Sequence, residues 1–261
     1  MEISNYLNNF FLKGNICKGD RVLLHSDISI LYKNLKKEKF KFTIDDIADF
    51  LINYIGDKGT LIIPTFNFNF CKGETFLINN TVSQMGVLSE KLRIKANKNR
   101  SWHPVYSFVI FGSTPKEYLK KKNYSAYSKD SLFHWITESD GKIGIIDLPD
   151  QKSMTYYHYV EECMNVNWRY MKSFWGDYID FNNKTQKIEA KIFVRKINKG
   201  IKTKVEEMEK ILWSKDLYQG HKKYSYAGCR SIRAKNLKFE VEKIIKDNKA
   251  LGVLYENEKI Y

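Results

Sequence analysis

Cysteines and long apolar runs are both scarce in this sequence. Cys17, Cys71, Cys163 and Cys229 are the only cysteines in 261 residues, and no two of them form a Cys-x-x-Cys pair. We therefore expect neither a disulfide framework nor a metal site. No apolar run approaches the roughly 20 residues of a membrane-spanning helix. The segment 1–12 lacks the basic lead and long apolar run of a targeting peptide, which predicts a cytoplasmic protein with no membrane partner.

Acidic residues are also in short supply, with 30 Asp and Glu against 44 Lys and Arg and a net charge of +14. A charge of this size bears on partners rather than on fold. Nucleic acid and a phosphorylated coenzyme are two candidate anionic partners, and lysine-rich solvated surfaces are the ordinary explanation. The basic residues are scattered through 33–41, 120–122 and 196–204 instead of forming a known nucleic-acid motif. A non-catalytic nucleic-acid-binding protein is the competing hypothesis, and we expect no nucleic-acid partner.

Strand-like and helix-like segments alternate along the first two thirds of the chain. Short apolar runs at 21–25, 60–64, 107–112 and 142–147 are typical of buried strands. Between them, Thr43 can cap a helix that Gly56 ends. This alternation predicts an α/β fold with helices on both faces of a sheet. After residue 170 we expect a strand at 190–195, two amphipathic helices through 205–212 and 241–245, and a C-terminal extension, 171–261, that packs on the domain formed by 1–170.

Five short motifs follow one another in the sequence. They are His25-Ser26, Gly59–Phe66 (GTLIIPTF), Met85-Gly86, Arg100–Phe108 (RSWHPVYSF) and His158–Glu161 (HYVE). This order resembles the aminoglycoside 3-N-acetyltransferase, or antibiotic N-acetyltransferase, family, whose enzymes move an acyl group from coenzyme A to a sugar amine. The resemblance implies a three-layer α/β/α sandwich and a catalytic core in 1–170 that binds acetyl-CoA or another acyl-CoA, with no metal.

The resemblance makes His158 the general base. Attack on a thioester requires a neutral amine, and histidine titrates near neutral pH. Glu161 lies three residues further on, so on a helix it shares a face with His158 and can orient the imidazole. The alternative is a covalent mechanism through Cys163, but this residue points to another side of the same helix.

The other motifs would bind the coenzyme. His25, Ser26 and Ser29 lie between a strand and a helix, where backbone N–H groups can bind a pyrophosphate, and we expect Asp27 to cap that helix or turn away. Met85 and Gly86 open the next helix, where the missing side chain of Gly86 would admit the pantetheine arm or simply begin the helix. By the resemblance, four further residues form the wall between coenzyme and acceptor: Arg100, Ser101, His103 and Ser107. Arg100 could equally form a structural ion pair.

The acceptor is the least defined partner. An enzyme that binds polycationic aminoglycosides is expected to line its cleft with carboxylates, whereas this chain is basic. Its Asp147–Asp150 segment (DLPD) and its insert at 67–80 also depart from the resistance enzymes. These differences resemble relatives that acylate a dTDP- or UDP-linked deoxyamino sugar for cell-surface polysaccharide, with an acetyl or short hydroxyacyl group. An aminoglycoside is the alternative acceptor, and a homodimer is compatible with either. The expected acceptor-binding residues are Phe68, Asp147, Asp150, Tyr157 and Trp175.

Overall fold

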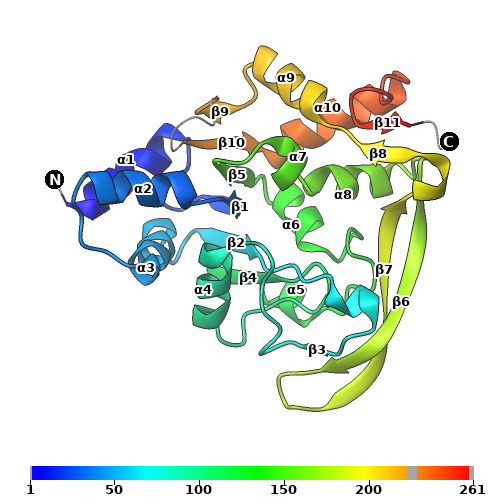
Figure 1. The fold of residues 1–261 in the computed structure, drawn as a ribbon, viewed down its shortest axis with the longest axis horizontal. Coiled ribbons are helices and arrows are strands. Elements are labelled where there is room, and N and C mark those ends of the chain that lie inside the picture. The colour runs from blue at the N-terminus through cyan, green and yellow to red at the C-terminus, as the bar shows by residue number, and fades with distance from the viewer. Residues whose placement is uncertain (1, 114, 223–227, 259–261) are drawn as a thin grey trace.

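The central feature is a six-stranded mixed sheet, seen in a computed structural model that describes residues 2–113, 115–222 and 228–258 (Figure 1). Its strand order is β4-β2-β1-β5-β10-β9. Strand β1 pairs in parallel with β2 and β5, whereas β4 and β10 add antiparallel strands on either side. The bounds are β1 Arg21–Ser26, β2 Thr60–Pro64, β4 Phe108–Gly112, β5 Lys142–Ile146, β9 Gln219–Gly220 and β10 Cys229–Arg233.

Two hydrophobic cores cover the two faces of this sheet. Along β1, Val22 and Leu24 face one core and Leu23 faces the other, because successive side chains of a strand point to opposite faces. The first core holds helices α1 (Ile3–Lys13), α2 (Ser29–Lys37), α3 (Ile44–Ile55) and α4 (Val87–Lys95). The second holds α6 (Leu132–Glu138), α8 (Tyr156–Cys163) and α10 (Ala234–Lys246). The predicted three-layer α/β/α sandwich is confirmed.

The rest of the described chain adds a long hairpin and several short elements. Strands β6 (Arg169–Ile179) and β7 (Thr185–Arg195) form the hairpin, and β3 (Phe76–Leu77) pairs with β6. Strand β8 (Ile201–Thr203) pairs with β11 (Tyr255–Asn257). The remaining helices are η1 Asn69–Lys72, α5 Lys116–Lys120, α7 Asp150–Ser153, η2 Ile197–Lys199 and α9 Glu206–Ser214. Within the described ranges, none of the helices combines the length and apolarity that crossing a bilayer requires.

Most of the expected elements occur close to their predicted bounds. Thr43 and Asp46 form a reciprocal capping box at the start of α3, and Gly56 ends the helix with φ 72°. The strand expected at 190–195 begins five residues earlier, at Thr185, because β7 pairs with β6 along its whole length. The sequence pattern does not predict the hairpin partner β6, since only two of its eleven residues are buried and their burial does not alternate.

The boundary expected at residue 170 falls inside β6. Strand β10, which belongs to the expected extension, pairs with β5 of the main sheet. Both parts of the predicted division therefore contribute strands to one sheet. The division into a catalytic core and an extension stays a prediction.

The layered core makes a direct stability prediction. Leu23 is completely buried between the sheet and the second helical layer. Leu23→Ala should lower the free energy of unfolding by about 3 kcal/mol, because it leaves a cavity in a packed interior. Leu12→Ala is the matched control, since Leu12 is 47% exposed and its loss should change stability little. Urea denaturation of both variants measures the difference, and equal losses would contradict the layered packing.

Candidate active site

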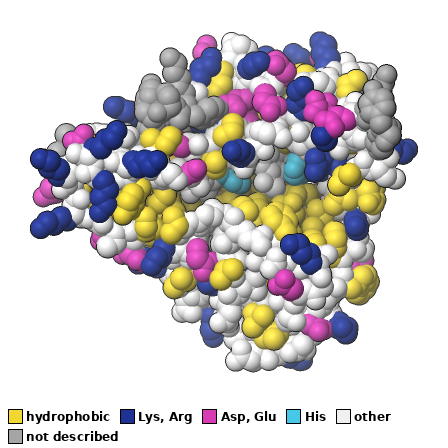
Figure 2. Space-filling model, in the orientation of Figure 1, with side chains coloured by type: hydrophobic (Ala, Val, Ile, Leu, Met, Phe, Trp, Pro, Cys, Tyr) yellow, Lys and Arg dark blue, Asp and Glu magenta, His cyan; other side chains and the backbone are white. Residues whose placement is uncertain are grey.

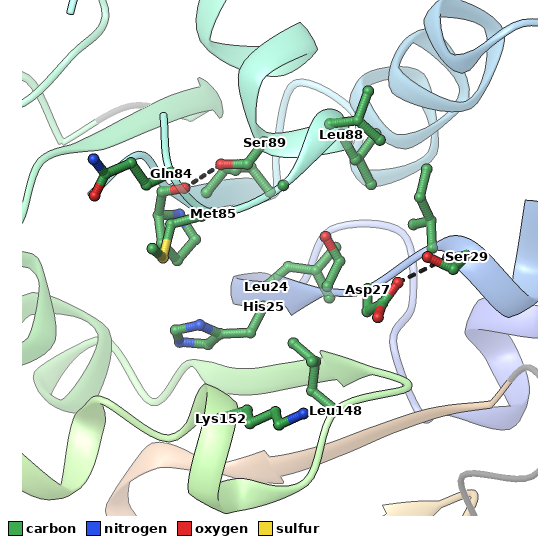
Figure 3. Close-up of a pocket in the computed structure, with 16 residues that line it drawn as sticks. Leu24, His25, Asp27, Ser29, Gln84, Met85, Leu88, Ser89, Leu148 and Lys152 are labelled. Carbon is green, nitrogen blue, oxygen red and sulfur yellow. Dashed lines mark hydrogen bonds between the residues drawn. The ribbon is translucent and has the colours of Figure 1, made fainter. Parts of the chain in front are cut away.

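A cavity of about 420 Å³ opens where the parallel strands β1, β2 and β5 end (Figure 3). Ligands of open α/β sheets bind at the carboxyl ends of strands, where the strand order reverses. Here the order reverses at β1, because β2 lies on one side of it and β5 on the other. Three segments form the walls: residues 24–29 after β1, residues 84–89 at the start of α4, and Leu148 with Lys152 after β5.

The first turns of α2 and α4 both line this cavity. Helix N-termini carry partial positive charge and favour anions. Gly86 has φ 96°, a left-handed conformation that glycine adopts readily, and a Cβ atom at this position would lie 3.9 Å from the backbone oxygen of Ser26. Asp27 turns back to accept a hydrogen bond of 2.9 Å from the backbone N–H of Ser29, at the start of α2 (Figure 3).

The five residues predicted from the first and third motifs are thus brought together in one cavity: His25, Ser26, Ser29, Met85 and Gly86. His25 is 6% exposed, and its Nε2 atom has no hydrogen-bond partner among the described residues. Burial lowers the pKa of His25 to about 3, so its imidazole is neutral at physiological pH. A neutral, unpartnered imidazole in a cavity wall can donate to or accept from a bound ligand.

His158 lies in a cluster with Glu161 and Arg169, which joins α8 to the start of β6. The Nδ1 atom of His158 is 2.9 Å from Glu161 Oε2 and 2.8 Å from Arg169 Nη2. Arg169 Nε lies 2.6 Å from the same Glu161 oxygen, and Trp168 donates to the other oxygen at 2.8 Å. Glu161 is 2% exposed, whereas the His158 side chain keeps 22% of its surface exposed. The carboxylate is therefore held inside the protein and the imidazole at its surface.

This environment keeps His158 neutral and Glu161 ionised. Burial lowers the pKa of His158, the Arg169 charge lowers it further, and the hydrogen bond that the imidazole donates to Glu161 opposes them only in part. Burial raises the pKa of Glu161, but Arg169 and His158 outweigh it and the pKa falls below its usual range. With the proton on Nδ1, His158 donates to Glu161 and leaves Nε2 as a basic atom; with the proton on Nε2, Nδ1 accepts from Arg169.

Aromatic side chains connect the cavity rim to His158. The backbone N–H of Phe68 donates to Gln84 of the cavity wall, and Phe68 packs edge-on against Tyr106. Tyr106 contacts Tyr127, whose ring centroid lies 6.0 Å from that of His158. Figure 2 shows hydrophobic side chains, with histidine at their edge, gathered across the middle of this face. The cavity and the histidine cluster therefore belong to one apolar surface.

The Arg100 to Phe108 motif lies behind this surface rather than in the cavity wall. Buried Arg100 donates to the carbonyl oxygens of Thr65, Ile78 and Thr81 and to the Ser107 hydroxyl. Ser101 accepts from the backbone N–H of Phe108. His103 Nδ1 accepts from the backbone N–H groups of Val105 and Tyr106.

Through these contacts the motif shapes the loop that carries Tyr106. Arg100 forms no ion pair with another described residue, because carbonyl oxygens surround its guanidinium in place of a carboxylate. The direct coenzyme contacts predicted for Arg100, Ser101, His103 and Ser107 stay a prediction.

The five residues predicted for the acceptor are not brought together. Asp150 and Tyr157 are buried, and the Tyr157 hydroxyl donates a hydrogen bond of 2.5 Å to the Asp150 carboxylate. Asp150 also accepts hydrogen bonds from Tyr218 and Arg230. The carboxylate of Asp150 is thus fully engaged inside the protein, which gives it a structural role. Phe68 lies at the cavity rim, whereas Trp175 is 67% exposed on the hairpin strand β6.

Asp147 sits directly beside Leu148 of the cavity wall and accepts a hydrogen bond from the backbone N–H of Gly228. Burial raises the pKa of Asp147 to about 6, so a substantial fraction of this carboxyl group is protonated near that pH. Asp147 is therefore a weak source of negative charge at the cavity, although it is the nearest of the predicted acidic acceptor residues to it.

Cys163 is an exposed residue at the end of α8. Partial burial of its thiol by neighbouring side chains raises the pKa of that thiol. The thiol is therefore protonated at neutral pH, which disfavours it as a nucleophile. Among the described residues, no group of three or more His, Cys, Asp and Glu side chains is placed to hold a metal ion.

Two site residues were not predicted. Arg169 belongs to β6, eleven residues after His158, so no helical spacing connects it to the His158–Glu161 pair. Lys152 lines the cavity from α7. Its position shortly after strand β5 is the only signal in the sequence that could have indicated its place at the cavity. Its ammonium group adds a positive charge at the cavity, opposite the exposed carboxylate of Asp27.

Comparison with known proteins gives a consistent family match. Residues 23–246 match the family model described as aminoglycoside 3-N-acetyltransferase. The chain is similar to a solved structure named AAC-IIIb binary with CoASH, with a TM-score of 0.77 and 15% identity over 94% of this chain and 96% of that one. It is also similar to the YokD protein from Bacillus subtilis, with a TM-score of 0.73 and 17% identity over 95% and 100% of the two chains.

A third similar structure is a histidine-to-alanine variant of aminoglycoside acetyltransferase AAC(3)-IVa in complex with apramycin. Its TM-score is 0.68, with 16% identity over 95% of each chain. At these identities the likeness to solved structures establishes the fold alone. No curated protein sequence matches the chain significantly.

The charge on Arg169 should be measurable in the titration of His158. Arg169→Gln should raise the pKa of His158, because a neighbouring positive charge that disfavours the imidazolium is removed. Arg195→Gln should move the pKa of His158 in the same direction by less, since Arg195 influences this imidazole less than Arg169 does. Glu161→Gln should lower the pKa further. NMR titration of the imidazole protons measures all three, and an unchanged pKa in Arg169→Gln would contradict the described cluster.

Proposed function

The chain belongs to the aminoglycoside 3-N-acetyltransferase family, and we propose that it transfers an acyl group from acyl-CoA to the amino group of a nucleotide-linked deoxyamino sugar. The His158–Glu161–Arg169 cluster carries this proposal, because it supplies a neutral imidazole with one ring nitrogen positioned by a buried carboxylate. None of the described residues forms a hydrogen bond with Nε2 of His158. That nitrogen is available to an acceptor amine.

The cavity beside β1 is the proposed acyl-CoA site. Its lining combines the N-terminal ends of α2 and α4 with the Lys152 side chain, all favourable for a pyrophosphate. Gly86 provides backbone without a side chain, and His25 Nε2 provides a buried polar atom for the pantetheine arm or the thioester. The CoASH complex of AAC-IIIb supports coenzyme A as the donor for a chain of this fold.

The proposed reaction is one direct transfer in a ternary complex. The acceptor nitrogen attacks the thioester carbonyl carbon, the new N–C bond forms, and the C–S bond breaks. His158 Nε2 takes the proton from the attacking amine, and this proton then neutralises the departing thiolate of coenzyme A. Glu161 stabilises the imidazolium formed in this step, as the carboxylate of a catalytic triad does. Arg169 acts through Glu161 and is a positioning residue.

Charge supports an anionic acceptor over a polycation. Glu161 and Asp150 are buried and hydrogen-bonded inside the protein, and Glu162 accepts from Ser125. Arg169 and Arg195 lie near enough to His158 to lower its pKa. Glu161 is paired with Arg169, and Arg195 adds a further positive charge near the base, which favours a nucleotide diphosphate and disfavours a tri- or tetracationic antibiotic.

The second candidate acceptor is an aminoglycoside. A similar structure, the AAC(3)-IVa variant, holds apramycin, which is the specific observation in favour of this acceptor. Asp27 and Asp147 are the acidic residues at or beside the cavity that would have to neutralise such a cation.

Loss of the proposed base should reduce turnover and spare coenzyme binding. His158→Asn should lower kcat by about 10²- to 10⁴-fold, as removal of a general base does. Cys163→Ala, on the same helix, is the matched control and should retain activity, because no acyl-enzyme forms. Assays of free thiol release measure kcat, and calorimetry measures coenzyme A affinity. Normal turnover in folded His158→Asn, or an acylated Cys163 peptide in mass spectra, would overturn the mechanism.

The pH dependence of kcat tests the same residue. Because the pKa of His158 is lowered, its basic form persists below the ordinary histidine pKa of about 6.5. The acid limb of the kcat profile should therefore lie below that pH in the wild-type protein and move to higher pH in Arg169→Gln. An acid limb above pH 7 in the wild type, where even an ordinary histidine is mostly deprotonated, would contradict the assignment.

The acceptor is tested by comparing substrates under one set of conditions. With acetyl-CoA, a dTDP- or UDP-linked 3- or 4-amino-dideoxyhexose should be turned over, and kanamycin or gentamicin should be poor acceptors. The nucleotide-sugar KM should rise with added salt, because ions screen its attraction to a basic protein. The opposite ranking would establish the aminoglycoside as the acceptor.

A further inference from the structure

A second hollow lies away from the proposed active site, between α5, the residues around Trp102 and the far end of β6. Its volume is about 590 Å³, in the range of small-molecule pockets. It shares no lining residue with the cavity beside β1. Helix α5 and the β3–β6 pair lie on the β4 side of the molecule, far from α9 and α10 (Figure 1). We call this hollow the α5 groove.

The α5 groove is strongly basic. Its lining includes the five exposed lysines Lys98, Lys116, Lys120, Lys122 and Lys184. None of these forms an ion pair with another described residue. The single carboxylate in the lining, Asp180, accepts hydrogen bonds from the backbone N–H groups of Asn182 and Lys184. The groove therefore presents excess positive charge that the described chain leaves uncompensated.

The floor of the groove is aromatic. The Trp102 and Tyr178 rings stack with centroids 5.4 Å apart and an interplanar angle of 27°, and Tyr124 packs edge-on against Trp102. Phe181 and Leu119 continue this apolar surface. Trp102 and Tyr178 are almost fully buried in this stack, so the edge of Trp102, Phe181 and Leu119 form the apolar surface against which a nucleobase can pack.

Two buried polar atoms at this floor also lack partners. Trp102 is 6% exposed and Tyr178 is 1% exposed, yet neither the indole Nε1 nor the phenol oxygen has a hydrogen-bond partner among the described residues. Leaving such groups unpaired costs free energy, which a ligand with hydrogen-bond acceptors would recover. Charge, stacking surface and unpaired donors therefore occur at one place.

We propose that the α5 groove is a binding site for a nucleotide with two or more phosphates, separate from the catalytic cavity. The base packs against the Trp102 edge, Phe181 and Leu119, and the phosphates bind the lysines of α5 with Lys122. A mononucleotide fits better than a nucleic-acid strand, because the basic and aromatic residues surround one compact hollow rather than an extended track. This site does not depend on the proposed acyl transfer, which involves none of its residues.

The test is calorimetric titration at low salt with UDP and ADP, and with uridine and inorganic pyrophosphate as separate probes. It uses the wild-type protein and Lys152→Gln, which removes the lysine of the catalytic cavity. Lys120→Gln with Lys122→Gln should weaken diphosphate binding by about tenfold or more, since two phosphate contacts are lost. The control, Lys13→Gln with Lys235→Gln, changes the net charge equally at exposed positions on α1 and α10 and should change affinity by less than about twofold.

Trp102→Phe separates the floor from the charge. It keeps an aromatic ring and removes the indole N–H, so UDP and ADP affinity should fall while pyrophosphate affinity stays the same. Uridine alone should bind weakly, since it lacks the phosphates.

Four outcomes would overturn the proposal. The first is an equal loss of UDP affinity in the control and groove variants, and the second is loss of UDP binding in Lys152→Gln but not in the groove variant. The third is pyrophosphate binding as tight as UDP binding. The fourth is tight binding of single-stranded oligonucleotides by a protein that does not bind UDP. Activity of the groove variants on the acceptor sugar is measured in parallel, so failure of the acyl-transfer proposal is seen independently.

Discussion

The buried ion pair between Glu161 and Arg169 is the interaction on which the site depends. It joins α8 to the first residue of the long hairpin, and Arg169 also donates to the Phe193 carbonyl of β7 and to Thr203 of β8. Separating the two partners of such a pair would leave each buried charge uncompensated, which costs several kcal/mol of free energy. Both side chains are therefore held in place. His158 is thereby oriented by an element that follows it in the chain, not by its own helix alone.

A second buried carboxylate repeats this arrangement at the start of α8. Asp150 accepts hydrogen bonds from Tyr157, Tyr218 and Arg230, which ties α7 and α8 to β10. Both acidic clusters satisfy their charges internally, whereas many lysines stay exposed. The consequence is that positive charge stays uncompensated among the described residues of the α5 groove, which is the basis for expecting an anionic ligand there.

The motifs found in the sequence serve two different purposes in the structure. His25, Ser26, Met85 and Gly86 line one cavity, and their contact with the coenzyme stays a prediction. Arg100 and its neighbours are as distinctive in sequence, yet they are buried and bond to loop carbonyls and N–H groups. A motif of polar residues can arise from the need to satisfy a buried loop as well as from ligand contact, and sequence alone does not separate these causes.

The sequence by itself determined the layered α/β fold, the helix capped by Thr43, and the His158–Glu161 pair, because alternation, capping and i,i+3 spacing are local patterns. Only the tertiary structure decided that Arg169 completes that pair, that Asp150 is buried, and that Trp102 stacks on Tyr178. Those contacts join segments far apart in the chain or in different elements. Their partners are selected by how strands and helices pack, and packing leaves no periodic signal in the residues themselves.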